Sequence, residues 1–138
     1  MTIHTPRTPS AVDNVAEEYA RQVYKNSPSM RIMSGVDGDP YELDDYSPAA
    51  AARHDELNAR TLAELDKAES TSANLDSVDA VTLDAMRERL GLERELHELG
   101  LDSGDLNVIA SPIQDLRDLF DLVPTQTAED WDLSLIHI

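Results

Sequence analysis

The spacing of the apolar residues constrains the fold of this chain more than any other sequence feature. They recur at steps of three and four residues, which places them on one face of an α-helix. No segment alternates apolar and polar residues long enough to predict a β-strand. The 138-residue sequence therefore predicts an all-α fold of four to five amphipathic helices, within residues 10–26, 47–70, 76–99, 111–123 and from 127 onward.

Short polar signals mark where these helices begin and end. Ser10 is followed three residues later by Asp13, a pattern typical of an N-terminal cap. The Ser-Pro pairs at 47–48 and 111–112 place a proline where its missing N–H costs nothing, at the first helical position. Gly100 predicts a left-handed end to the helix that begins near residue 76.

The apolar faces of the predicted helices differ in width. The first helix has one stripe, formed by Val12, Val15, Ala16, Tyr19 and Val23. The second has a stripe of Ala50, His54, Leu57, Thr61, Leu65 and Ala68, widened by Leu62. The third has one side made of Val78, Val81, Ala85, Leu92, Leu96 and Leu99, widened by Leu83, Met86 and Leu90. So broad a band predicts burial against more than one neighbour, and Gly91 inside it either admits a close helix or marks a kink.

Residues 27–46 read as an irregular connection. Gly35, Gly38 and Pro40 interrupt any helix there. The segment also contains apolar residues that we expect to anchor it on the helices, namely Met30, Ile32, Met33 and Tyr41. A connection of this length is unusual in a compact domain and points to a function or to missing neighbours.

Charge and composition exclude several classes of protein. Lys and Arg number 11 against 28 Asp and Glu, so the net charge of −17 argues against a nucleic-acid binder and against a polybasic membrane anchor. The absence of cysteine excludes disulfides and thiolate metal sites. The longest apolar run, residues 49–52, is far too short to span a membrane, and no secretory signal opens the chain, so we expect a cytoplasmic protein.

No residue of the chain stands out as catalytic, cofactor-binding or metal-binding. The four histidines are never three or four residues apart, and the HExxH motif of zinc peptidases is absent. His97 is expected in the last turn of a helix, near its C-terminus. The run at 54–56 (HDE) reads as an ordinary helix face. The run at 37–42 (DGDPYE) does not fit the spacing of a calcium loop.

The last six residues differ in composition from the rest of the chain. Residues 133–138 (LSLIHI) turn apolar just after an acidic helix start, and they back-translate as CTG TCT CTT ATA CAC ATC. That string resembles the end of a transposase-based sequencing adapter. We therefore expect three parts: a disordered tail at 1–9, a helical portion of a larger domain at 10–132, and an adapter artefact at 133–138.

An ordered set of strings resembles the N-terminal region of the bacterial domain-of-unknown-function 885 (DUF885) family. The resemblance covers about residues 11–132. It rests on seven strings, VAEEY at 15–19, NSP at 26–28, LDDYSP at 43–48, DAVTL at 79–83, IASPIQDL at 109–116, FDLVP at 120–124 and TAEDW at 127–131.

The resemblance implies a much larger, mostly helical protein that acts as a zinc metallopeptidase. Members of the family carry an HExxH helix and a further glutamate ligand in their C-terminal half, none of which maps onto this sequence. The chain would then be the N-terminal part of a helical wall, inactive alone. Its partners would be the missing C-terminal part of its own chain and a peptide substrate, and residues 35–46 would lie near the cleft.

Two other interpretations remain open at this point. The chain could be a small acidic helical module, complete as it stands, which binds a basic protein partner and has no enzymatic activity. It could also be a structural subunit.

Overall fold

The computed structural model describes residues 7–102, 104, 107–109, 111–121 and 124–136. The described residues form helices and no strand, which confirms the all-α prediction. The helices are α1 (Ala11–Asn26), α2 (Pro28–Met33), α3 (Pro48–Thr71), α4 (Ser77–Glu98), α5 (Pro112–Phe120) and α6 (Ala128–Ile136). Within this described part, no helix is both long enough and apolar enough to cross a lipid bilayer.

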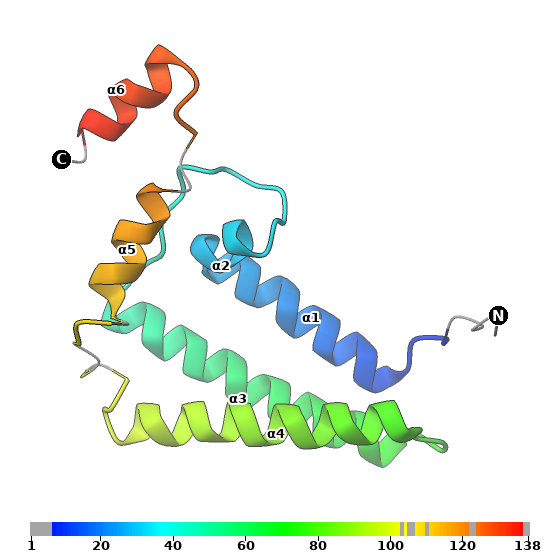
Figure 1. Ribbon diagram of the computed structural model, residues 1–138. Coiled ribbons are helices and arrows are strands. Elements are labelled where there is room, and N and C mark those ends of the chain that lie inside the picture. Colours follow the sequence, from blue (N-terminus) through cyan, green and yellow to red (C-terminus); the bar gives the residue numbers. More distant parts are fainter. Residues whose placement is uncertain (1–6, 103, 105–106, 110, 122–123, 137–138) are drawn as a thin grey trace.

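Three long helices make up the packed part of the molecule. Helices α3 and α4 form an antiparallel hairpin, and α1 packs against both of them. Helix α2 lies at the far end of α1, while α5 and α6 extend away from the three-helix unit (Figure 1). The chain therefore has one packed end and one open end.

The hydrophobic core lies where α1, α3 and α4 meet. Val12 and Leu65 are fully buried, together with Ala68 and Leu83, and Val15 and Met86 pack against them. Val12 and Val15 belong to the expected stripe of α1, and Leu65 and Ala68 to that of α3, so both stripes contribute to the core as predicted. Gly100 has a φ of 69° and ends α4 as expected, with the Leu101 N–H bonded to the Leu96 carbonyl at 2.9 Å.

The buried face of α4 is not the one that its longest stripe indicated. Leu83 and Leu90 are buried and Met86 is half-buried, although the sequence analysis treated them only as a widening of the stripe. The principal stripe, from Val78 to Leu99, is exposed instead. Successive residues turn by 100° along a helix, so the two sets lie on roughly opposite faces. Among the described residues, α4 packs through one face and leaves the other open.

The segment 27–46 contains a helix, although its sequence predicts an irregular connection. Helix α2 begins with Ser27 as its cap and Pro28 at its first position, which is the same Ser-Pro signal that opens α3. It ends at a left-handed Gly35, whose φ is 68°. With six residues it is too short to show a helical apolar period, and only the capping pair could have predicted it.

Polar contacts, rather than apolar anchors, hold the connection after α2. Met30, Met33 and Tyr41 are exposed, so the expected apolar anchoring is wrong for these three. Instead the Asp44 carboxylate accepts hydrogen bonds from the Ser27 hydroxyl at 2.7 Å and from the Ser29 hydroxyl at 2.6 Å. It also accepts the Ser29 backbone N–H at 2.8 Å, which satisfies a free donor at the start of α2.

Arg31 holds the far part of the same connection. Its guanidinium donates to the Glu42 carboxylate at 3.0 Å and to the Asp39 carbonyl at 2.9 Å. Gly38 packs on that side chain so closely that an added Cβ would lie 2.3 Å from the Arg31 Nε.

A charged cluster joins the first turns of α1 and α4. Ser10 and Asp13 form a capping box on α1, and Asp76 and Asp79 form one on α4. The Ser10 hydroxyl donates to Asp79 at 2.6 Å, and the Arg7 guanidinium contacts all three aspartates. Residues 1–6 of the expected tail lie outside the described residues, whereas Arg7 is held in this cluster.

The surface of the molecule is large for its mass. A compact monomer of 15.3 kDa exposes about 7,100 Å² by the usual size scaling. This chain exposes 10,074 Å². Helices α5 and α6 extend away from the three-helix unit (Figure 1), and large apolar side chains of α4 are exposed.

Candidate functional site

A zinc site requires several His, Asp or Glu side chains that converge on one point. The described residues contain no group of three or more such side chains that could hold a metal ion. In the run at 54–56, His54 contacts Glu93, Asp55 pairs with Arg94 at 3.0 Å, and Glu56 is exposed. The described residues therefore do not fit a zinc ion.

Four side chains from three helices form the main polar network. Asn58 on α3 is almost fully buried and lies at its centre. The Tyr19 hydroxyl on α1 donates to the Asn58 carbonyl oxygen at 3.2 Å, and the Asn58 amide donates to the Glu93 carboxylate on α4 at 2.9 Å. His54 Nε2 lies 3.2 Å from the same carboxylate. The network joins all three long helices.

The network changes the acidity of two of its members. The contact with His54, together with the Asn58 amide, lowers the pKa of Glu93 below its ordinary value, because both stabilise the charged carboxylate. Burial, followed by the nearby Glu93 charge, raises the pKa of Tyr19 to about 12. Both groups therefore keep a fixed charge state at neutral pH: Glu93 is ionised and Tyr19 is neutral.

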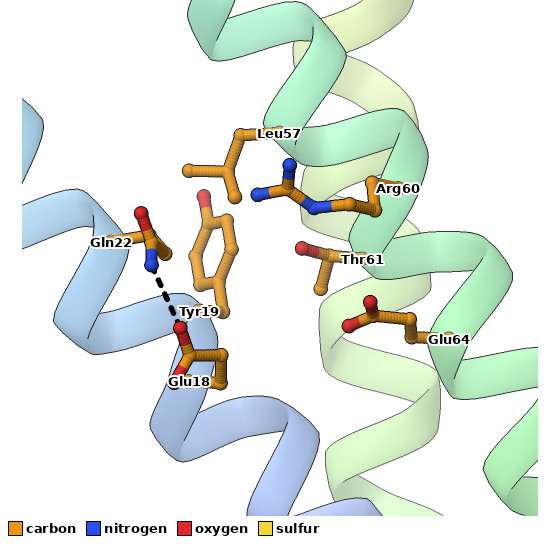
Figure 2. Close-up of a pocket in the computed structure, with 7 residues that line it drawn as sticks. All are labelled: Glu18, Tyr19, Gln22, Leu57, Arg60, Thr61 and Glu64. Carbon is orange, nitrogen blue, oxygen red and sulfur yellow. Dashed lines mark hydrogen bonds between the residues drawn. The ribbon is translucent and has the colours of Figure 1, made fainter.

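A cavity of about 300 Å³ opens between α1 and α3, beside this network. Figure 2 shows its lining, with Tyr19 reaching from α1 toward α3 and Arg60 facing it from α3. Gln22 donates to Glu18 at 2.8 Å on the α1 wall. The residues that line it are Glu18, Tyr19, Gln22, Leu57, Arg60, Thr61 and Glu64.

A second cavity, of about 330 Å³, lies on the other side of Tyr19, between α1 and α4. Its lining includes Ala16, Met86 and Leu90, so it is more apolar than the first. Tyr19 thus separates two hollows, and α1 is packed less closely here than at the core around Val12. Neither cavity brings together a nucleophile, a base and an orienting group, which acyl-transfer catalysis requires.

Two other sequence features are placed as structural contacts. His97 lies in the last turn of α4, as expected, and its Nδ1 is 2.5 Å from the Asp102 carboxylate. That contact raises the pKa of His97 above its ordinary value. In the run at 37–42, the Asp39 carboxylate accepts the Tyr41 backbone N–H at 2.9 Å and so closes a local turn.

The residues at the centre of these clusters were not anticipated. Asn58 and Asp79 are polar and nearly fully buried, yet the sequence pattern placed neither of them on a buried face. A usable signal existed for Asn58, because it is next to Leu57 on the expected stripe and one turn after His54. For Asp79 the signal was its place three residues after Asp76, which is the spacing of a capping box.

A family model described as a bacterial protein of unknown function, DUF885, matches residues 28–135. The match covers α2 to α5 completely. It also includes residues 133–135, which are three of the six residues predicted to come from a sequencing adapter, and that prediction stays a prediction. A comparison with curated proteins found no match.

Proposed function

This chain belongs to the DUF885 family of bacterial proteins, and on that premise we propose that it forms part of the helical wall of a larger, zinc-dependent peptidase-type hydrolase. In this proposal the metal ligands lie in a part of the protein beyond this chain. The chain binds no metal and is inactive by itself. We place the protein in the cytoplasm, without nucleic-acid or membrane partners.

The observation that carries the proposal is the surplus of exposed surface. About 3,000 Å² more area is exposed than a compact monomer of this mass would show. Large apolar side chains are exposed on α4 and at Val108, Ile109, Ile113 and Trp131. Apolar area of this extent is typical of a surface that packs against further protein.

The connection between α2 and α3 is the segment that we place nearest the substrate cleft of the larger protein. The Tyr41 hydroxyl in this connection donates to Asp130 on α6, which links it to the projecting arm. That contact raises the pKa of Tyr41 to about 12 and lowers the pKa of Asp130. Side chains exposed here, such as Val36 and Leu43, would then face an extended peptide.

The test is to read the gene past codon 132 in clean genomic DNA and to express the protein it encodes. We expect a continuing reading frame with an HExxH motif and a later glutamate, zinc bound to that protein, and peptide hydrolysis that is lost when either motif histidine is changed to alanine. The 138-residue chain should bind no zinc. A longer protein that binds no zinc and hydrolyses no peptide contradicts the proposal.

An acidic interaction module is the second candidate, and the net charge of −17 favours it. Such a module would use its carboxylates to attract a basic partner. It requires residues 1–132 alone to unfold cooperatively and to bind a basic protein with marked salt dependence. The gene sequence separates the two candidates, because a complete module needs no HExxH motif downstream.

A further inference from the structure

Helix α4 has a second apolar face that no described residue covers. Its large side chains are exposed by 37 to 69 % of their surface. They are spaced by three, four or seven residues along about 31 Å of helix, at 1.5 Å per residue. The face, called here the outer face of α4, consists of Val78, Val81, Ala85, Leu92, Leu96 and Leu99.

The acidic residues of α4 divide into two groups, according to whether they have a partner. Asp79, Glu93 and Glu98 have partners: Asp79 contacts Arg7, Glu93 contacts Asn58 on α3, and Glu98 lies 3.8 Å from Arg94 one turn back on α4 itself. The remaining three, Asp84, Glu88 and Glu95, are exposed and have no ion pair with any described residue.

The three unpaired acids share one edge of the outer face. With a turn of 100° per residue, they fall within a narrow sector beside Val81, Ala85 and Leu92. Arg89 is exposed on the opposite edge. The outer face is therefore a long apolar stripe with a row of uncompensated negative charge on one side, which is the pattern of a helix that pairs with another helix.

The charges limit which helix can pair with it. A second copy of the chain would bring another 17 negative charges to the interface and would set like charges against one another. Helices α5 and α6 are acidic and apolar and contain one basic residue in their described sequence, Arg117. A favourable occupant must supply basic groups along the edge that carries Asp84, Glu88 and Glu95.

We propose that the outer face of α4 receives an amphipathic helix whose apolar stripe is flanked by Lys or Arg, and that this helix comes from the further part of the same polypeptide. The inference rests on the proposed function for the source of the helix. The chemistry of the occupant rests only on the exposed stripe and its acidic edge.

The chemistry can be tested with two synthetic 21-residue helical peptides. Both carry leucines at the same heptad positions, and one has lysines along the flank where the other has glutamates. We expect the lysine peptide to bind the 138-residue chain about tenfold more tightly, because three exposed pairs of about 0.5 kcal/mol each sum to about 1.5 kcal/mol. Equal binding of the two peptides, or binding of neither, overturns the proposal.

Charge reversal supplies the control for non-specific attraction. Glu88→Lys with Glu95→Lys should reverse or abolish the preference for the lysine peptide. Glu56→Lys with Glu64→Lys on α3 changes the net charge by the same amount and should leave the preference in place. If both double variants lose the preference equally, the attraction comes from the net charge and the acidic edge has no part in it.

The source of the helix can be tested by thiol labelling, because the chain contains no cysteine. A single Leu92→Cys variant should react rapidly in the 138-residue chain and at least about tenfold more slowly in the longer protein, while Glu56→Cys reacts equally in both. Equal reaction rates at position 92 in both proteins would contradict the proposal that the helix comes from the same polypeptide. If the gene encodes no protein longer than this chain, the proposed function is wrong. The peptide experiment would still test whether the acidic edge of α4 selects a basic helix.

Discussion

Asn58 on α3 makes hydrogen bonds to both of the other long helices. It accepts from Tyr19 and donates to Glu93, so its amide satisfies groups on α1 and α4 together. A buried amide with both partners in place stabilises one arrangement of the helices, because any sliding would leave polar groups unpaired.

Replacing Asn58 with alanine should therefore destabilise the chain. We expect Asn58→Ala to lower the free energy of unfolding by about 1–3 kcal/mol, since it removes two hydrogen bonds and enlarges the neighbouring hollows. Urea unfolding followed by circular dichroism measures the change. Asn14→Ala is the matched control, because Asn14 is exposed on α1 and its side chain makes no hydrogen bond with a described residue. Equal effects of the two variants would show that Asn58 has no special role.

Acid should weaken the contact between α3 and α4. The pKa of Glu93 is lowered in the folded chain. Its contacts therefore stabilise the fold at pH values above the unfolded pKa of about 4.3, and this stabilisation is lost as the pH falls through the folded pKa. The pKa of Asp76 is lowered to about 2 by Arg7 and acts in the same direction. Unfolding midpoints measured from pH 7 to pH 3 should therefore fall with pH.

Glu93→Gln isolates the Glu93 part of that pH dependence. The variant should be less stable than the native chain at pH 7, and its stability should fall less steeply between pH 5 and pH 3. An identical slope in both proteins would show that Glu93 does not contribute.

At the scale of single elements, α4 contains a position where a substitution should increase the stability of the chain. Gly91 lies in the interior of the helix, and a Cβ added there would meet no atom within 4 Å. We expect Gly91→Ala to stabilise the chain by about 0.5–1 kcal/mol, because alanine restricts the unfolded chain and favours helix. A loss of stability in thermal unfolding would contradict the open space described here. Gly100→Ala should destabilise instead, because Gly100 has a positive φ.

Helix α2 depends on a residue from outside itself. Asp44 satisfies the Ser29 N–H and accepts from Ser27 and Ser29 hydroxyls. Asp44→Ala should therefore speed amide hydrogen exchange in Ser29–Arg31 by about five- to tenfold, which corresponds to about 1 kcal/mol of lost capping. Asp37→Ala, in the same connection but without a side-chain contact, should leave those amides unchanged. Unchanged exchange in the Asp44 variant would show that the cap is dispensable.

Helix boundaries were predictable because caps are local. Ser10, the two predicted Ser-Pro starts and Gly100 all mark ends that the structure confirms. The choice of buried face on α4 was not predictable, because the helix has two apolar stripes and a 3.6-residue period cannot tell which one meets α1 and α3. Burial depends on which neighbouring helices pack against a face: Leu83 lies in the core with Leu65 and Val12, and Leu90 is buried farther along α4.

At the scale of the whole molecule, the packed unit is smaller than the chain. The core lies at one end of α1, α3 and α4, the two hollows flank Tyr19, and α5 and α6 project beyond (Figure 1). The absence of a recognisable catalytic motif was visible in the sequence. The polar network was not, because Tyr19, Asn58 and Glu93 are far apart along the chain and only the packing of three helices brings them together.

The most direct test of the central claim, that apolar faces of this chain stay uncovered, is the binding of a dye that fluoresces on exposed apolar surface. We expect the 138-residue chain to bind it at pH 7, to unfold over a broad temperature range, and to lose much of the fluorescence in a Val81→Glu, Leu92→Glu double variant that remains equally helical. A chain that binds no dye and unfolds in one sharp transition would contradict the claim.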